Sequence, residues 1–373
     1  MRRIALAGLV FAVVACGGSA GAAPPRSGSP SSSAAGAATT KAADLRTRLD
    51  LLLAEQMIIV AKETDAAVNH SDEYPGYTTL LGTNAGDLAS VVGSAYGNTA
   101  GAQLAQTWNE EDAGLIDYAI GIVVHDQARA NTAWSSVMTQ SVPQLAQLLA
   151  ELTKIPASRL IEAIHNELTA VKEMVDDTFG QRYKLVYTEL HNASLAGAGI
   201  GDLLIAPIAQ QFADKFPGDP TARPVDSRVQ LALSMQEGAY LSTLMTETVV
   251  AGRAAENLAV SSALVTNANA LSALVAGRFG SQTGAAFLVA WSGRLGGLAG
   301  YAGGDQASAR QLIDYDVTQL STQLRIDPGP LKDQAAAAIK VIDDQRSRSY
   351  DVLADDDRAA AAATQAVSDE LTA

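Results

Sequence analysis

Two stretches decide the fold because they match each other: residues 96–108 read YGNTAGAQLAQTW, and residues 279–291 read FGSQTGAAFLVAW. The offset of 183 positions that aligns them also superimposes two of the three tryptophans in the chain, Trp108 and Trp291. Self-similarity at a fixed offset is the signature of an internal repeat, so we predict a tandem duplication with about 145 to 175 residues per copy.

The later part of the repeat aligns at a different offset, near 171. Here LTAVKEMVDD, residues 168–177, is similar to AIKVIDDQ, residues 338–345. The two copies are joined by FPGDPTARPVD, residues 216–226, whose three prolines would not be tolerated in a helix interior. We therefore place copy one at residues 43–219 and copy two at residues 225–373.

Each copy has the pattern of an all-α protein. At the start of copy one, apolar residues recur at steps of three and four, as on the buried face of a helix. They are Leu45, Leu49, Leu52, Leu53, Met57 and Val60. Only 5% of the residues are aromatic, and helices rich in Ala and Gly can pack closely. We predict two antiparallel, four-helix-bundle-like units with short loops.

Glycines and aromatic residues mark corresponding places in the two copies. Gly97 is expected to end a helix and Asn98 to cap the next one, and Gly280 and Ser281 repeat this arrangement. Further breaks are expected at residues 75–76, 155–156 and 327–330, where prolines occur. The large aromatic side chains are interpreted as core anchors and not as a ligand cage; they are Trp108, Trp291, Tyr118 and Tyr301.

The single cysteine, Cys16, follows an apolar run at residues 4–15 that has the layout of an export signal. The stretch VVAC, residues 13–16, resembles a bacterial lipobox, and this resemblance implies cleavage before Cys16 and acylation of its thiol. A buried thiol, an intermolecular disulfide and a catalytic nucleophile are the alternatives, but the Ser/Gly/Ala/Pro-rich run that follows supplies neither a core nor a base. We predict a signal peptide at residues 1–15 and a lipid anchor with a disordered linker at residues 16–42.

The charge of the chain limits its partners. It has 26 Lys and Arg residues against 40 Asp and Glu residues, and removal of Arg2 and Arg3 with the signal leaves 24 basic residues and a net charge of −16. Such a surface repels phosphate backbones and anionic head groups. We expect no nucleic-acid partner. Attachment to the extracytoplasmic face of a membrane is expected through the lipid alone, with no later membrane-spanning segment, and a protein partner at the cell surface remains open.

Several short motifs resemble an uncharacterised family of exported bacterial helical proteins, which carry stretches of the types LAEH, WxxH, LLxEH and AYxHM. The corresponding stretches here are LAEQ (53–56), WNEE (108–111), IEAIH (161–165) and YTELH (187–191), and QQFADKF (210–216) resembles a segment that closes the family pattern. The resemblance implies a helical bundle with one candidate metal ligand per helix.

The resulting candidate ligands are His165, His191, Glu111, Gln56 and Glu55. Imidazole and carboxylate together suit a transition metal, namely zinc, iron, nickel or copper. The alternative is that these are ordinary hydrogen-bonded side chains. The second copy has no histidine, and it places Gln236 and Arg294 opposite Gln56 and Glu111, with Arg294 on a close-packed, inert helix face.

No other motif marks a catalytic site. His70 and His125 fall in expected turns and are interpreted as solvated. The acidic runs at residues 110–111, 176–177 and 355–357 are also interpreted as solvated faces, because nothing near them in the sequence supplies an apolar enclosure. The sequence therefore favours a non-enzymatic binding or scaffolding module, with a metal-binding or metal-sequestering protein as the alternative.

Overall fold

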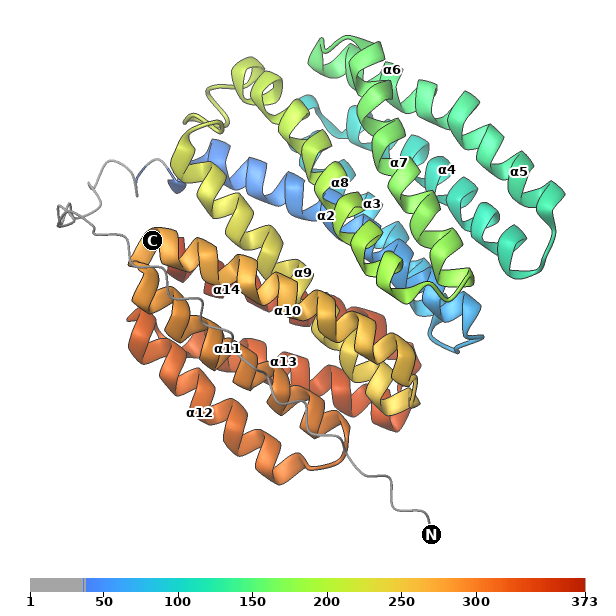
Figure 1. Cartoon of the computed structure of the whole chain (residues 1–373). Helices are drawn as coiled ribbons and strands as arrows, with labels where there is room; N and C mark the ends of the chain where they lie inside the picture. The colour runs from blue at the N-terminus through green and yellow to red at the C-terminus, as the bar shows by residue number, and fades with distance from the viewer. Residues whose placement is uncertain (1–35, 37, 373) are drawn as a thin grey trace, which may run out of the picture.

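The computed structural model describes residue 36 and residues 38–372, and every regular element in this part of the chain is a helix. The all-α prediction is confirmed. The predicted signal peptide and Cys16 lie outside the described residues. Figure 1 follows the helices from blue to red. The first half contains α2 (Lys41–Val68), α3 (Tyr74–Tyr96), α4 (Asn98–Val123), α5 (Gln127–Ser136), the π-helical turn η1 (Val137–Ser141), α6 (Val142–Thr153), α7 (Ala157–Phe179) and α8 (Tyr183–Gln211). The second half contains α9 (Arg223–Ala251), α10 (Ala254–Phe279), α11 (Ser281–Ala302), α12 (Gln306–Leu324), α13 (Pro328–Ser347) and α14 (Tyr350–Thr372).

The proline-rich joint connects α8 to α9. Pro224 lies in the first turn of α9, where the N–H that proline lacks would have no partner in the helix. At the other end of copy one, α2 begins two residues before the predicted boundary, and its first turn is capped by Thr40, whose Oγ1 accepts a hydrogen bond from the Ala43 N–H at 3.2 Å.

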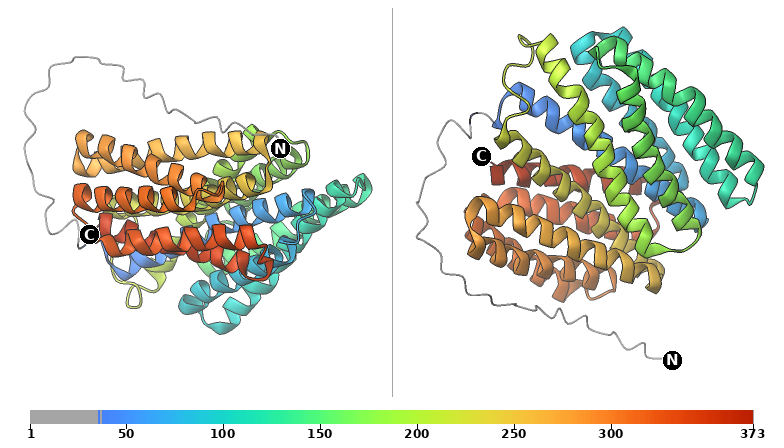
Figure 2. Two further views of the ribbon diagram at one scale, coloured as in Figure 1. Left: turned by 90° about the horizontal axis from the view of Figure 1, so that it is seen from below. Right: turned by 45° about the horizontal axis from the view of Figure 1, so that its top comes forward.

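Helices α2 and α9 form the centre of the molecule. Figure 1 shows them between α4–α7 on one side and α11–α13 on the other, and the two views in Figure 2 show the same division between the blue and green helices and the orange and red ones. Both central helices bury charged as well as apolar side chains. The apolar stripe predicted for the first helix is present, but the opposite face is also covered, because the second half packs on it.

The two halves face each other through paired contacts. On α2, Arg46 binds Asp202 of α8 through Nε at 2.9 Å, while its Nη1 binds Asp226 of α9 at 2.5 Å and the Pro220 carbonyl at 2.8 Å. On α9, Arg228 uses the same atoms for its own three partners. Its Nε binds Asp369 of α14 at 3.2 Å, and its Nη1 binds Asp44 of α2 at 2.6 Å and the Ala38 carbonyl at 2.9 Å.

These pairs define which positions correspond. Arg228, Asp226 and Pro220 each lie 182 residues after Arg46, Asp44 and Ala38, and Asp369 lies 167 residues after Asp202. Each arginine reaches across to the other half, so the contacts are reciprocal, as in a two-fold symmetric dimer interface. This is the arrangement that a duplication predicts, although the common ancestry of the halves stays a prediction.

Two further pairs of contacts repeat in the two halves, between residues that lie 182 or 183 positions apart, or 167 in the case of Asp176 and Asp343. Asn84 donates a hydrogen bond to Glu55 at 2.8 Å, as Asn267 does to Glu237 at 3.2 Å. The hydroxyl of Tyr118 donates to Asp176, as that of Tyr301 does to Asp343. In the last two helices of each half, residues that make equivalent contacts are therefore 167 positions apart, and not about 171 as the sequence alignment indicated. The change in offset falls where α12 takes the place of α5, η1 and α6.

The two halves share one hydrophobic core. A single cluster of buried apolar residues includes Leu45 near the start of α2 and Leu371 near the end of α14. Helix α8 packs against α2 of its own half and α10 of the other, and α14 packs against α9 and α3 in the same way. The terminal helix of each half therefore completes the core of its neighbour.

The predicted caps are displaced by one residue. Gly97 ends α3 and also stands directly before α4, so Asn98 is the first helical residue and not the cap. Gly280 has the same role between α10 and α11, with Ser281 as the first helical residue. Both glycines have φ values above +90°, at 97° and 93°, which residues with a Cβ rarely adopt. One glycine replaces a longer loop in each half.

Two helices, α8 and α10, are long and apolar enough to cross a membrane by length and composition alone, contrary to the expectation that no such segment follows the signal. This is weak evidence for a membrane span. Helix α8 has 56% of its most apolar window buried inside the protein, and α10, at 33%, is packed against α8, α9 and α11.

Candidate functional site

A group of acidic and amide side chains is buried in the core of the first half. Gln56 of α2 donates a hydrogen bond from Nε2 to Asp112 of α4 at 2.7 Å. Glu111 of α4 and Glu167 of α7 are buried with them, at 2% and 1% exposure. In the described part of the chain, one side-chain oxygen of each of these four residues has no hydrogen-bond partner. No cation is paired with any of the three carboxyl groups there.

Burial controls the protonation of this group. Loss of solvation raises the pKa of Glu111 to about 8. The pKa values of Asp112 and Glu167 are also raised well above the usual range, first by burial and then by the neighbouring acidic groups. A carboxylic acid in an apolar enclosure keeps its proton because the charged form would lose its hydration. Burial therefore favours the protonated, uncharged form of these three carboxyl groups.

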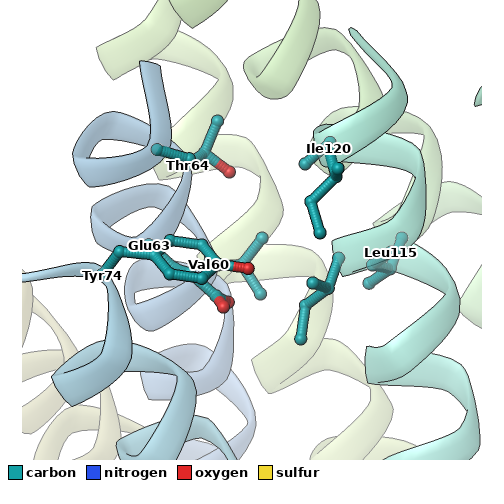
Figure 3. Close-up of a pocket in the computed structure, with 9 residues that line it drawn as sticks. Val60, Glu63, Thr64, Tyr74, Leu115 and Ile120 are labelled. Atoms are coloured by element: carbon teal, nitrogen blue, oxygen red, sulfur yellow. The ribbon is translucent and has the colours of Figure 1, made fainter. Parts of the chain in front are cut away.

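A small cavity lies nearby, between α2, α3 and α4. Figure 3 shows Glu63 and Tyr74 on one side of it, and Leu115 and Ile120 on the other. Its volume is about 10 Å³, which leaves room for roughly one water molecule. Glu63 is held by Thr78, whose hydroxyl donates to its Oε1 at 2.6 Å. The cavity is too small for an organic ligand.

The five predicted metal ligands do not come together in one place. Gln56 and Glu111 belong to the buried acidic group, but Glu55 faces the other half, where it accepts hydrogen bonds from Tyr240 and Arg358. Adjacent residues of a helix point about 100° apart, so Glu55 and Gln56 cannot serve the same site. Among the described residues, no three His, Cys, Asp or Glu side chains converge closely enough to hold a metal ion.

The two candidate histidines have different environments. His191 of α8 is half exposed, and its Nδ1 lies 2.8 Å from Oε1 of Glu237 on α9. This contact raises the pKa of His191. His165 of α7 is partly buried, and its Nε2 has no partner in the described part of the chain. His70 and His125 are exposed and both have positive φ values, as expected for turn residues.

The interpretation of the acidic runs as solvated faces is wrong for one residue in each run. Glu111, Asp177 and Asp357 are buried, while their neighbours Glu110 and Asp355 are exposed. Helical rotation separates consecutive side chains, so an acidic run can place one member in the core. The same rotation places Asp112 and Glu167 in the core, and no sequence motif marks either residue.

The second half has different chemistry at the equivalent positions. Trp108 and Trp291 are both buried, at 2% and 4% exposure. Trp291 stacks on Phe287 with ring centroids 5.4 Å apart, and the Arg294 guanidinium lies 4.8 Å from its ring. Arg294 of α11 occupies the place of Glu111, and at 1% exposure it lies on a closely packed helix face, as predicted. The paired contacts also show that Glu237 corresponds to Glu55, so Gly238, and not Gln236, lies opposite Gln56.

The largest of the pockets described lies between α2, α9 and α14 and has a volume of about 380 Å³. A smaller pocket of about 90 Å³ lies between α2, α8 and α9. The two are related by the same offsets as the paired contacts: Arg48, Glu55, Arg358 and Ala362 in the large pocket correspond to Gln230, Glu237, His191 and Leu195 in the small one. Nothing in the sequence singled out Arg48 or Arg358, because the large pocket exists only where the halves meet.

The large pocket is the strongest candidate for a binding site in the described structure, because it combines size, charge and unpartnered polar groups. Its lining includes three arginines, Arg48, Arg228 and Arg358. Gln236 and Gln365 also line it, and each has a side-chain oxygen without a hydrogen-bond partner in the described part of the chain. Comparison with protein families, with curated proteins and with solved structures finds no match for this chain.

Proposed function

We propose that this protein is a non-enzymatic binding module, exported and anchored to a membrane through a lipid on Cys16, that holds a small ligand in the pocket between α2, α9 and α14. The observation that carries the proposal is the difference between the two related pockets, about 380 Å³ against about 90 Å³. A volume near 380 Å³ falls within the usual range of small-molecule sites, roughly 300 to 1,000 Å³.

The walls of the pocket support a binding role. They come from three helices that meet at the contact between the halves, and Arg228 and Arg358 are held there by ion pairs to Asp369 and Glu55. A site whose side chains are already fixed loses little entropy when a ligand binds. Alternatively, the pocket could receive a side chain of a protein partner, as a scaffolding role would require. The tryptophan substitutions described next distinguish a small ligand from a partner side chain.

The test compares the mature chain with two tryptophan substitutions. Ala362→Trp would fill the large pocket, and Leu195→Trp is the matched control at the equivalent position of the small pocket. Both residues are exposed, so neither change disturbs the core. Thermal unfolding is measured against a panel of small polar metabolites. A ligand at a hundred times its Kd stabilises the folded state by about 2.7 kcal/mol.

We expect at least one compound to raise the Tm of the unmodified chain and of Leu195→Trp, but not of Ala362→Trp. A panel in which no compound stabilises the protein, or in which Ala362→Trp responds as the unmodified chain does, would refute the small-molecule proposal and leave the protein-partner role.

A further inference from the structure

We propose that the ligand of the α2–α9–α14 pocket is a small zwitterion of amino-acid or dipeptide size, with a carboxylate that binds Arg48, an ammonium group that faces Asp44 and Asp369, and an apolar side chain. This inference rests on the proposed function and names the chemical class of its ligand.

The first step concerns the positive charges. Arg228 is occupied by Asp44 at 2.6 Å and Asp369 at 3.1 Å, and Arg358 is occupied by Glu55 at 2.9 Å and Asp87 at 2.8 Å. Arg48 differs, because it is exposed and forms no hydrogen bond or ion pair with the described residues. A free guanidinium can bind a carboxylate through two parallel hydrogen bonds. One anionic group of the ligand therefore has a place beside α2.

The second step concerns the groups that can accept hydrogen bonds. Glu55 is saturated, since it accepts from Tyr240, Asn84 and Arg358. Asp44 and Asp369 bind Arg228 through Oδ1 only, and their side chains are 58% and 46% exposed, so Oδ2 of each remains available.

Amides add to this accepting side of the pocket. Gln236 lines both pockets and is only 8% exposed, and its Oε1 has no partner among the residues that the structure describes. Gln365 lines the large pocket and adds a second such oxygen. Leaving a buried acceptor unpaired costs about 1 to 3 kcal/mol, which a donor on a ligand would recover. An ammonium group supplies three donors and a positive charge that suits the two aspartates.

The remaining lining is apolar and comes from Leu51, Leu52 and Ala362. This surface favours an aliphatic part in the ligand, since burial of apolar area is favourable and a further charge here would have no partner. A leucine-like side chain beside an amine and a carboxylate therefore satisfies all three parts of the pocket.

The second pocket provides an internal comparison. Position 230 holds glutamine where the large pocket has Arg48, and position 195 holds leucine where the large pocket has Ala362. The supporting contacts of Arg46 and Arg228 are the same in the two halves, so the framework is shared while the lining differs. The large pocket combines an open volume with a free cation, which is the combination a charged ligand needs.

The experiment is titration calorimetry on the full mature chain with four probes. L-leucine and glycyl-L-leucine carry both charges, 4-methylpentanoate lacks the amine, and 3-methylbutylamine lacks the carboxylate. We expect saturable binding of at least one zwitterion, at least ten-fold tighter than either single-charge probe. Arg48→Gln should weaken this binding at least ten-fold, and Gln230→Ala, the matched change in the other pocket, should leave it unchanged.

Failure of both zwitterions to bind, equal binding of a single-charge probe, or full binding by Arg48→Gln would each overturn the assignment of the ligand class. These failures are distinguishable from failure of the proposed function. If the metabolite panel still yields a ligand that Ala362→Trp excludes, the pocket binds a ligand of another class; if it yields none, the pocket is not a small-molecule site at all.

Discussion

Lys62 on α2 and Asp357 on α14 form a buried salt bridge, with Nζ and Oδ2 2.5 Å apart and both side chains at most 1% exposed. The bridge joins the two halves of the chain. By the offsets of the paired contacts, Lys62 corresponds to Leu244 and Asp357 corresponds to Leu190. Both leucines are buried. Two related surfaces have thus been filled in different ways, one by a charged pair and one by two leucines.

This relationship predicts how the interface responds to substitution. Lys62→Leu leaves the Asp357 carboxylate buried without its cation and should lower the free energy of unfolding by about 3 to 5 kcal/mol, as for other buried pairs that lose one partner. The double variant Lys62→Leu, Asp357→Leu should be more stable than the single variant, because it recreates the leucine pair. Urea unfolding measures both.

Tyr77 and Thr243 limit how much stability the double variant regains. Each donates a hydrogen bond to Asp357 and would lose that acceptor in the double variant. A double variant that is less stable than Lys62→Leu alone would contradict the proposed correspondence with Leu244 and Leu190.

The two arginines of the paired contacts make a second prediction. Arg46→Met and Arg228→Met should each lower the free energy of unfolding by about 1 to 3 kcal/mol, less than a fully buried pair, because the partner aspartates are about half exposed. Arg46→Met should cost more than Arg228→Met, because Arg46 also pairs at 3.4 Å with the buried Asp50, whereas alanine stands at the corresponding position 232. A larger loss for Arg228→Met than for Arg46→Met would contradict this account.

Stability should also depend on pH through Glu111. Its pKa in the folded protein is about 8, above the usual value of 4.5, so the folded state keeps a proton that the unfolded chain releases. The contribution of Glu111 to the free energy of unfolding is therefore greatest below about pH 4.5. It decreases as the pH rises towards 8, by up to about 1.4 kcal/mol per pH unit.

Glu111→Gln should flatten this part of the stability profile, because the amide does not titrate. Its exposed neighbour provides the matched control, and Glu110→Gln should leave the profile unchanged. Chemical unfolding at several pH values between 4.5 and 8.5 measures the slope. An equal slope in Glu111→Gln and in the unmodified chain would mean that Glu111 is charged in the folded protein.

The close approach of α3 and α4 depends on a glycine from the stretch that decided the fold. A Cβ on Gly101 would lie 2.7 Å from the carbonyl oxygen of Ala89, so Gly101→Ala must push the helices apart and should cost about 1 to 3 kcal/mol. Gly82→Ala on the open side of α3 is the control and should be neutral or slightly stabilising, since nothing lies within 4 Å of the new methyl group and alanine favours a helix. Thermal unfolding distinguishes the two.

The sequence was sufficient for the helical class, for the joint near Pro220 and for the two glycine links, because these features depend on local periodicity and on backbone conformation. It was not sufficient for the interface. Arg46, Lys62 and Asp357 belong to charged faces of helices, and such faces are normally solvated. Here they are covered by the other half, as when Arg46 binds Asp226, which lies 180 residues further along the chain. Local patterns contain no information about that cover.

The candidate site shows the same limit. Histidines are rare in this chain and stand out in its sequence, whereas the pocket is lined by common residue types. Arg48, Gln236 and Arg358 come from three helices that meet only in the folded chain.

The most direct test of the central claim, that the halves share one core and fold as one unit, uses the two aligned tryptophans as separate probes. Chains that keep only Trp108 or only Trp291, with the other tryptophans changed to Phe, are unfolded in urea and followed by fluorescence. Within each chain, the fluorescence transition should coincide with the loss of helix measured by circular dichroism, because neither half can lose its core alone. A chain in which the tryptophan signal of one half changes at a clearly lower urea concentration than the helix signal would show two independent domains.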